Sequence, residues 1–314
     1  MSPCLRRILS YHKPRLSGSL RVLPFRSRAL GITKHILVYE PPGLRRRRSD
    51  VHLLYLFRGH EREWANREED DSRKQSSIEL LDQLITNAEI PPLMAVMPGF
   101  TSVDGRKHGL GINMMGDTGE ARDGLGSGLF WDFMIDDLIP YIEARYEKKL
   151  AGGLRLSSGF SIGGYTTALL ATAFPGYLDH AGIYDGLLMF DSQIDRRTGK
   201  PDKIWMQSGV MDAALGPAAE RIAGELSVWN PAEQLYYADP ISIQEMHDTM
   251  FWIRSAAGDG QEGNHDRCAY FKQLLQQRGV AAGFNRIPLH PDASHTWHWN
   301  DRFLRLFLMN VFSL

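Results

Sequence analysis

The sequence lacks several features that would place a protein in a specialised class. It has only two cysteines in 314 residues, which excludes a disulfide framework and any Cys-x-x-Cys metal or redox motif. No run of about 18 apolar residues exists, so no membrane-spanning helix is predicted. The formal net charge is −1, which provides no general attraction for nucleic acid or an anionic membrane. The basic N-terminal stretch has no apolar core of about seven residues, so we predict no secretory signal and expect a cytoplasmic protein.

What the sequence does contain is enough apolar residues, 43% of the chain, to bury a large core. Short apolar runs typical of buried strands alternate with segments of helical periodicity. This alternation predicts an α/β fold with a mostly parallel twisted sheet and helices on both faces. The first two strands have no helix between them, so we expect them to form an antiparallel hairpin at one edge. The expected strands are residues 20–25, 35–40, 51–57, 93–97, 154–160, 180–186, 250–256 and 281–289, and the expected helices are residues 78–88, 130–146, 163–173, 264–278 and 299–312.

A single domain is predicted over residues 20–314, preceded by an N-terminal extension over residues 1–19. Residues 188–250 match no simple strand–helix unit. Insertions of this kind above the strand ends commonly form lids or pocket walls. Trp229 in this segment and Trp297 near the C-terminus are candidates for substrate-binding walls, with ordinary core packing as the alternative.

A candidate nucleophile lies in the stretch Gly159-Phe160-Ser161-Ile162-Gly163. An apolar strand precedes it and a helical segment follows it. A serine hydroxyl needs exposure, a base and nearby amide donors to act as a nucleophile. A sharp turn between small residues would lift Ser161 above the sheet, and the helix N-terminus would direct the Ile162 N–H at a developing oxyanion. The alternative is a plain turn in which the glycines only allow close packing.

The acid and the base are expected on loops after later strands, in the order serine, acid, histidine. Asp259 follows the strand at 250–256, and His295 follows the last strand. Both lie at the carboxyl ends of strands, where open α/β sheets place their sites, so Asp259 is the predicted acid and His295 the predicted base. The alternatives are Glu262, Asp266 and Asp185 for the acid, and His290 and His298 for the base.

Metal binding is another interpretation of the histidine-rich C-terminal segment. His290, Asp292, His295 and His298 could together be ligands. Their spacing is irregular and no second ligand cluster occurs elsewhere in the sequence, which argues against a metal site. We therefore predict no metal and no cofactor.

The loop after the strand at 51–57 is the expected source of a second oxyanion donor. Gly59 would let the backbone turn in closely, which makes the His60 N–H the candidate and Gly59 the alternative. Arg58 is a candidate for contact with an anionic or polar part of the substrate, or it is a solvated loop charge. The four arginines at 45–48 predict a solvent-exposed connection, because no aromatic residues interleave them.

These residues, in this order, resemble the esterase-D-like branch of the α/β-hydrolases, which includes feruloyl esterases, enterochelin-type siderophore esterases, S-formylglutathione hydrolases and mycolyltransferases. The resemblance runs from about residue 20 to the C-terminus, and its most specific parts are GFSIGGYTTALLATAFPGYLDHAGIYDG and SHTWHW. It implies an α/β-hydrolase fold in which Ser161 is the nucleophile, His295 the base and Asp259 the acid. It also implies an oxyanion hole made by the Ile162 and His60 amides.

Three positions depart from the pattern of that family. Arg58-Gly59 stands where His-Gly is usual, Ile162 where Met is common, and Asp185-Gly186 where Ser-Gly is frequent. Position 162 uses only its backbone N–H, so that change should be harmless. The change at position 58 borders the expected pocket and bears on substrate preference, and the aspartate at 185 favours a local role for its carboxylate.

Together these observations predict a serine carboxylic-ester hydrolase that works through a Ser-His-Asp triad and an acyl-enzyme intermediate. An acyltransferase with the same triad and a catalytically silent binding protein on the same scaffold are the alternatives. The expected partner is a small-molecule ester, with no nucleic acid and no membrane. A homo-oligomer is compatible with the sequence.

Overall fold

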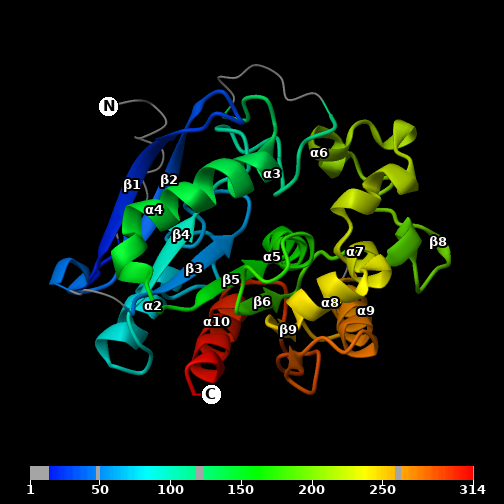
Figure 1. Ribbon diagram of the computed structural model, residues 1–314. Helices are drawn as coiled ribbons and strands as arrows, with labels where there is room; N and C mark the ends of the chain where they lie inside the picture. The colour runs from blue at the N-terminus through cyan, green and yellow to red at the C-terminus, as the bar shows by residue number, and fades with distance from the viewer. Residues whose placement is uncertain (1–13, 47–49, 117–123, 259–262, 314) are drawn as a thin grey trace.

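An eight-stranded sheet forms the centre of the protein, with the strand order β1-β2-β4-β3-β5-β6-β9-β10 (Figure 1). β1 pairs antiparallel with β2, and β2 pairs antiparallel with β4. Every other pairing in this sheet is parallel. The predicted mostly parallel sheet with an antiparallel N-terminal hairpin is therefore confirmed. The computed structural model describes residues 14–46, 50–116, 124–258 and 263–313.

The strands and helices of this core agree closely with the segments expected from the apolar pattern. The strands are β1 (Ser19–Arg26), β2 (Thr33–Glu40), β3 (His52–Phe57), β4 (Leu93–Met97), β5 (Arg155–Phe160), β6 (His180–Tyr184), β9 (Met250–Arg254) and β10 (Ala282–Gly283). The helices are α2 (Ser77–Thr86), α3 (Phe130–Asp132), the π-helical η3 (Phe133–Leu138), α4 (Ile139–Leu150), α5 (Ile162–Ala173), α9 (Asn264–Gln277) and α10 (Trp297–Val311).

The sheet buries a separate apolar core on each face, because successive strand residues point in opposite directions. On one face α4, α5 and α9 contribute residues such as Ile142, Leu170 and Phe271. On the other face α2 and α10 contribute residues such as Leu81 and Phe307. Helices therefore cover both faces, as predicted.

Two elements differ from the sequence prediction, and each difference has a local cause. The helix expected over residues 130–146 contains the π-helical η3, because Pro140 follows it. Proline has no N–H and its ring clashes with the carbonyl four residues earlier, so Ile139 N–H donates instead to Met134, five residues back. The last strand is only two residues long, because Phe284 turns the chain at a φ of 64°.

Residues 188–250 contain only short elements and pack against α5. Trp205 and Leu226 of this segment form a third apolar cluster with Tyr165 and Leu169 of α5. Its elements are η4 (Asp191–Gln193), β7 (Ile194–Asp195), β8 (Lys200–Pro201), η5 (Gly209–Met211), α6 (Asp212–Leu215), η6 (Ala218–Glu220), η7 (Ala223–Trp229), α7 (Pro231–Tyr237) and α8 (Pro240–Met246). Among the described residues, no helix has both the length and the apolar character needed to cross a membrane.

Candidate active site

Ser161 lies in a strained turn between β5 and α5. Its φ of 58° and ψ of −118° are disfavoured for any residue with a side chain. Two backbone hydrogen bonds hold this turn: Ser161 N–H donates to Tyr184 O at 3.1 Å, and Leu187 N–H donates to Ser161 O at 2.9 Å. α5 begins at Ile162, so the first amides of the helix, which have no acceptor inside it, lie next to the Ser161 side chain.

The glycines on either side of Ser161 are required by close backbone approach. A Cβ at Gly159 would lie 2.0 Å from the carbonyl oxygen of Gly163. A Cβ at Gly163 would lie 1.8 Å from the carbonyl oxygen of Phe57 in β3. Because both obstacles are backbone atoms, they cannot rotate away, and the turn keeps its shape only with glycine at these two positions.

We expect Gly163→Ala to destabilise the protein by about 3 kcal/mol, since the added methyl group forces α5 away from β3. This corresponds to a fall in the melting temperature of roughly 6 °C. Gly224→Ala is the matched control, because a Cβ at Gly224 would meet no atom within 4 Å. Thermal unfolding of the two variants followed by circular dichroism measures the difference, and equal melting temperatures would contradict the close approach.

A buried carboxylate binds the His295 ring. His295 Nδ1 lies 2.5 Å from Asp185 Oδ2, and the Asp185 side chain is only 3% exposed. Asp185 directly follows β6; its N–H donates to Arg254 O at 2.8 Å, and its Oδ1 accepts the Ala256 N–H at 3.0 Å. Because Nδ1 is engaged with Asp185, Nε2 is the ring nitrogen that can serve Ser161.

Of the three other acid candidates, the structure describes Asp266. Asp259, the predicted acid, and Glu262 fall outside the described residues. Asp266 forms an ion pair with Arg197 at 3.2 Å. Asp185, which the sequence also offered, is the described carboxylate that meets the imidazole.

The other two histidines considered as bases have different neighbours. The His290 ring stacks on Trp299 with a centroid distance of 5.4 Å. The backbone N–H of His298 donates to Ser72 Oγ at 3.1 Å. Within the described ranges, no three His, Cys, Asp or Glu side chains are grouped so that they could hold a metal ion.

Contacts on both sides hold the loop that carries His295. The Tyr184 hydroxyl donates to Ser294 O at 2.8 Å. The Trp297 N–H donates to Asp70 Oδ2, also at 2.8 Å. The residue before His295 is thus anchored to β6, and the start of α10 is anchored to the segment between β3 and α2.

Ser161 and His295 line the same cavity, which has a volume of about 460 Å³. Four of the lining residues come from the inserted segment: Lys203, Ile204, Ser208 and Met211. Besides Ser161 and His295, the polar lining residues are Arg58, His108, Lys203 and Ser208. The apolar lining residues are Leu110, Ile162, Leu187, Ile204 and Met211. The mixture provides space for an apolar acyl or alcohol group beside a serine and a histidine.

Three of the polar lining residues were not predicted from the sequence. His108 lies in the loop after β4, and Lys203 and Ser208 lie in the inserted segment. No local motif marks any of them. Their place in the site depends on how these loops fold over the ends of the strands.

His60, the predicted second oxyanion donor, is placed differently. Its backbone N–H donates to Glu63 Oε1 at 2.5 Å. Its side chain lines another hollow, together with Thr33, His35 and Thr101. The carboxylate of Glu63 therefore occupies the donor that was expected to face Ser161.

The two predicted tryptophan walls are part of the packing and do not line the cavity. Trp297 is 3% exposed and packs against Trp64, with a ring-centroid distance of 5.1 Å. Trp229 packs near Trp131 at 6.2 Å, and its carbonyl accepts the hydroxyl of Tyr165. Both tryptophans therefore have the alternative role given above, which is packing within the protein. Arg58, the third predicted substrate contact, does line the cavity.

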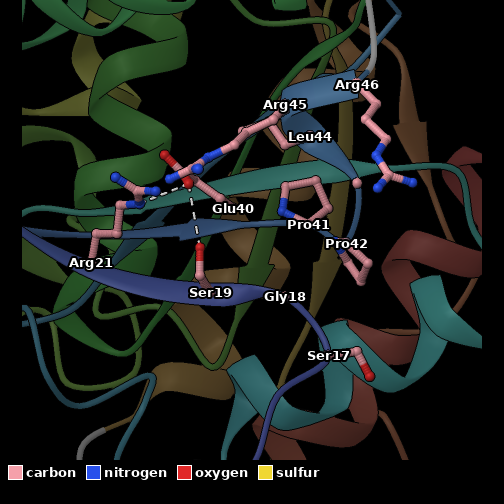
Figure 2. Close-up of a pocket in the computed structure, with 11 residues that line it drawn as sticks. Ser17, Gly18, Ser19, Arg21, Glu40, Pro41, Pro42, Leu44, Arg45 and Arg46 are labelled. Carbon is pink, nitrogen blue, oxygen red and sulfur yellow. Dashed lines mark hydrogen bonds and ion pairs between the residues drawn. The ribbon is translucent and has the colours of Figure 1, made fainter.

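A second hollow, of about 500 Å³, lies at the edge hairpin and the turn after β2 (Figure 2). Arg21 and Ser19 both contact Glu40 there, at 2.7 and 3.3 Å. Arg45 and Arg46 line it and are exposed, as expected for the arginine run, whereas Arg47 and Arg48 lie outside the described residues. None of the described residues that line this hollow is a histidine that could act as a base for a serine.

The fold and the site together define a class of protein. A serine on a strained strand–helix turn shares one cavity with a carboxylate-bound histidine, above the carboxyl ends of parallel strands, which is the arrangement of a serine esterase with the α/β-hydrolase fold. A family model described as putative esterase matches residues 27–304, so the chain belongs to that family. A search of curated proteins finds no significant match.

Solved structures with the same fold cover nearly the whole chain. A ferulic acid esterase superposes with a TM-score of 0.65 at 15% identity, covering 95% of this chain and 99% of that one. An S-formylglutathione hydrolase from Agrobacterium tumefaciens gives 0.61 at 14% identity, covering 94% and 96%. A fluorophosphonate-binding serine hydrolase from Staphylococcus aureus gives 0.57 at 15% identity, covering 93% and 98%.

Proposed function

We propose that this esterase hydrolyses carboxylic esters through an acyl-enzyme on Ser161, with His295 as the base and Asp185 as the carboxylate that orients it. The observation that carries this proposal is the 2.5 Å contact between His295 Nδ1 and Asp185 Oδ2, in a cavity that Ser161 also lines. Asp185 takes the role predicted for Asp259, because both residues follow strands whose carboxyl ends meet at the same edge of the sheet.

In the first step Ser161 Oγ attacks the acyl carbon, and His295 Nε2 takes the hydroxyl proton. The carbonyl oxygen becomes an oxyanion, which the Ile162 N–H and the positive end of α5 stabilise. Asp185 stabilises the imidazolium and fixes the tautomer in which Nδ1 carries the proton. His295 then gives its proton to the departing alcohol, which leaves the acyl group on Ser161.

In the second step water attacks the acyl-enzyme, with His295 again taking a proton. Collapse of the second tetrahedral intermediate releases the carboxylic acid and returns the proton to Ser161. This chemistry needs no cofactor, since the nucleophile, the base and the oxyanion donor are all part of the chain.

A fluorophosphonate probe tests this proposal, because it reacts with an activated serine and not with an ordinary hydroxyl. We expect the native protein to be labelled once, on the peptide containing Ser161, and to hydrolyse 4-nitrophenyl esters of short acids. Heat-unfolded protein is the control and should not be labelled. A native protein that neither reacts with the probe nor hydrolyses any ester would overturn the proposal.

A further inference from the structure

We propose that the substrate of this site carries an anionic group, such as a carboxylate, which Arg58 and Lys203 bind while Ser161 attacks the ester. This inference rests on the proposed function and adds the chemical class of the substrate. It is based on two basic side chains, Arg58 from the loop after β3 and Lys203 from the inserted segment, which line one cavity with Ser161 and His295.

Arg58 is held in position before any ligand binds. Its Nε lies 3.3 Å from Glu63 Oε2, and its guanidinium lies over the ring of Phe160 at 4.8 Å. The Phe160 ring also contacts the proposed base, since its centroid lies 4.7 Å from that of the His295 ring. Arg58 and His295 are therefore packed against the same aromatic side chain. The Glu63 carboxylate approaches the inner nitrogen, and no hydrogen bond joins the two terminal NH2 groups to another described residue, so these groups provide a fork that suits a carboxylate.

Lys203 supplies the second cation from the inserted segment. Its side chain is exposed, and no carboxylate among the described residues forms an ion pair with it. It follows the buried Asp202, whose ion pair with Arg267 at 2.8 Å fixes this part of the inserted segment. A flexible ammonium on a fixed backbone can close over an anion that Arg58 already orients.

Among the described residues, none that line this cavity is a carboxylate. His108 adds no charge near neutral pH, because burial, helped by the nearby Arg58, lowers the pKa of its imidazole. The positive character is local, since the whole chain has a formal net charge of −1. Glu63 offsets part of the charge of Arg58, and the two basic side chains still make the described lining of the cavity more favourable for an anionic ligand than for a neutral one.

Two pairs of esters test the inference, because they place the charge on either side of the scissile bond. The acyl pair is mono-(4-nitrophenyl) adipate and its methyl ester. The alcohol pair is 4-acetoxybenzoate and its methyl ester. Within each pair the two esters differ by one charge and one methyl group, so the ratio of their kcat/KM values measures recognition of the charge.

We expect the wild-type enzyme to prefer the anionic member of at least one pair by about tenfold. Arg58→Gln and Lys203→Gln should each lower that ratio about threefold or more, and the double variant should bring it close to one. Lys200→Gln is the matched control, since Lys200 is also exposed and does not line the cavity. It should keep the wild-type ratio. Raising the salt concentration to about 0.5 M should weaken the preference.

Two results would overturn the inference. In the first, the wild-type enzyme hydrolyses the methyl ester at least as well as the anionic ester in both pairs. That result would leave the esterase mechanism intact. The other is a preference that survives in the double variant. If Arg58→Gln lowers the melting temperature by leaving Glu63 without its partner, Lys203→Gln still decides the question, because an exposed side chain can be changed without strain. Failure of the proposed function is recognised separately, by no turnover of any ester and no fluorophosphonate labelling.

Discussion

Replacing Ser161 by alanine should lower kcat for every ester by about 10⁴-fold or more and abolish fluorophosphonate labelling. Ser161 Oγ is the only protein atom that the proposed mechanism bonds to the acyl carbon, so its removal prevents formation of the acyl-enzyme. Turnover of a 4-nitrophenyl ester and gel detection of the probe measure the two effects. The fold should be unaffected, since the turn is held by the backbone bonds of Ser161 and not by its side chain.

Ser242→Ala is the control for this variant, because Ser242 lies on α8, donates its hydroxyl to the N-cap residue Asp239 and is not among the residues that line the cavity. It should keep wild-type turnover and labelling. If Ser161→Ala retains full activity, the nucleophile is assigned wrongly even though the protein remains an esterase. A slow residual rate is expected in Ser161→Ala, because the oxyanion donor and the base can still assist attack by water.

Replacing Asp185 by asparagine should lower kcat by about 10³-fold with little change in the melting temperature. The new side chain can still accept the Ala256 N–H through its oxygen, which directs its NH2 group at His295 Nδ1. The histidine must then carry its proton on Nε2, where it cannot take a proton from Ser161. Steady-state kinetics measures the loss, and the far-downfield imidazole proton resonance of a short Nδ1–H···O bond should vanish from the NMR spectrum.

Asp259→Asn decides between the two candidate acids. If Asp185 orients His295, this variant should stay within about threefold of the wild type in kcat. The opposite pattern, a large loss in Asp259→Asn and near-normal turnover in Asp185→Asn, would restore the acid predicted from the sequence and remove Asp185 from the mechanism. Comparing the two variants on one substrate keeps the result independent of substrate choice.

The sheet could be predicted because the spacing of apolar residues and the turn residues that bound each segment are signals carried by a few neighbouring positions in the sequence. β4 was predicted at its exact bounds, and α5 within one residue of its start. The π-helical η3 was not, although Pro140 was visible, because a proline after a helical run signals a break more often than a shift in hydrogen bonding. The last strand came out short because its pairing is decided at Phe284 by a backbone conformation that the side chain does not reveal.

The site could be predicted only in part. Ser161 and His295 were found through their order and their place after strands, and they do share a cavity. The choice of acid could not be made in this way, since several βα loops open at the same sheet edge and spacing treats them alike. The hydrogen bond of His60 to Glu63 depends on how a polar loop closes on itself, and the positions of Trp229 and Trp297 depend on the core. None of these leaves a pattern along the chain.

The backbone bonds between the turn at Ser161 and the end of β6 have a consequence for partial unfolding. Ser161 N–H is held by Tyr184, the neighbour of Asp185, while Asp185 is held by Arg254 of β9. The nucleophile and the acid therefore belong to one cooperative unit at the centre of the sheet, and an opening that releases one releases the other. Among the three groups of the proposed triad, only the histidine can be lost separately, by opening of its loop. We therefore expect inactivation to begin with release of the His295 loop, while the serine and its strand neighbours remain ordered without a base.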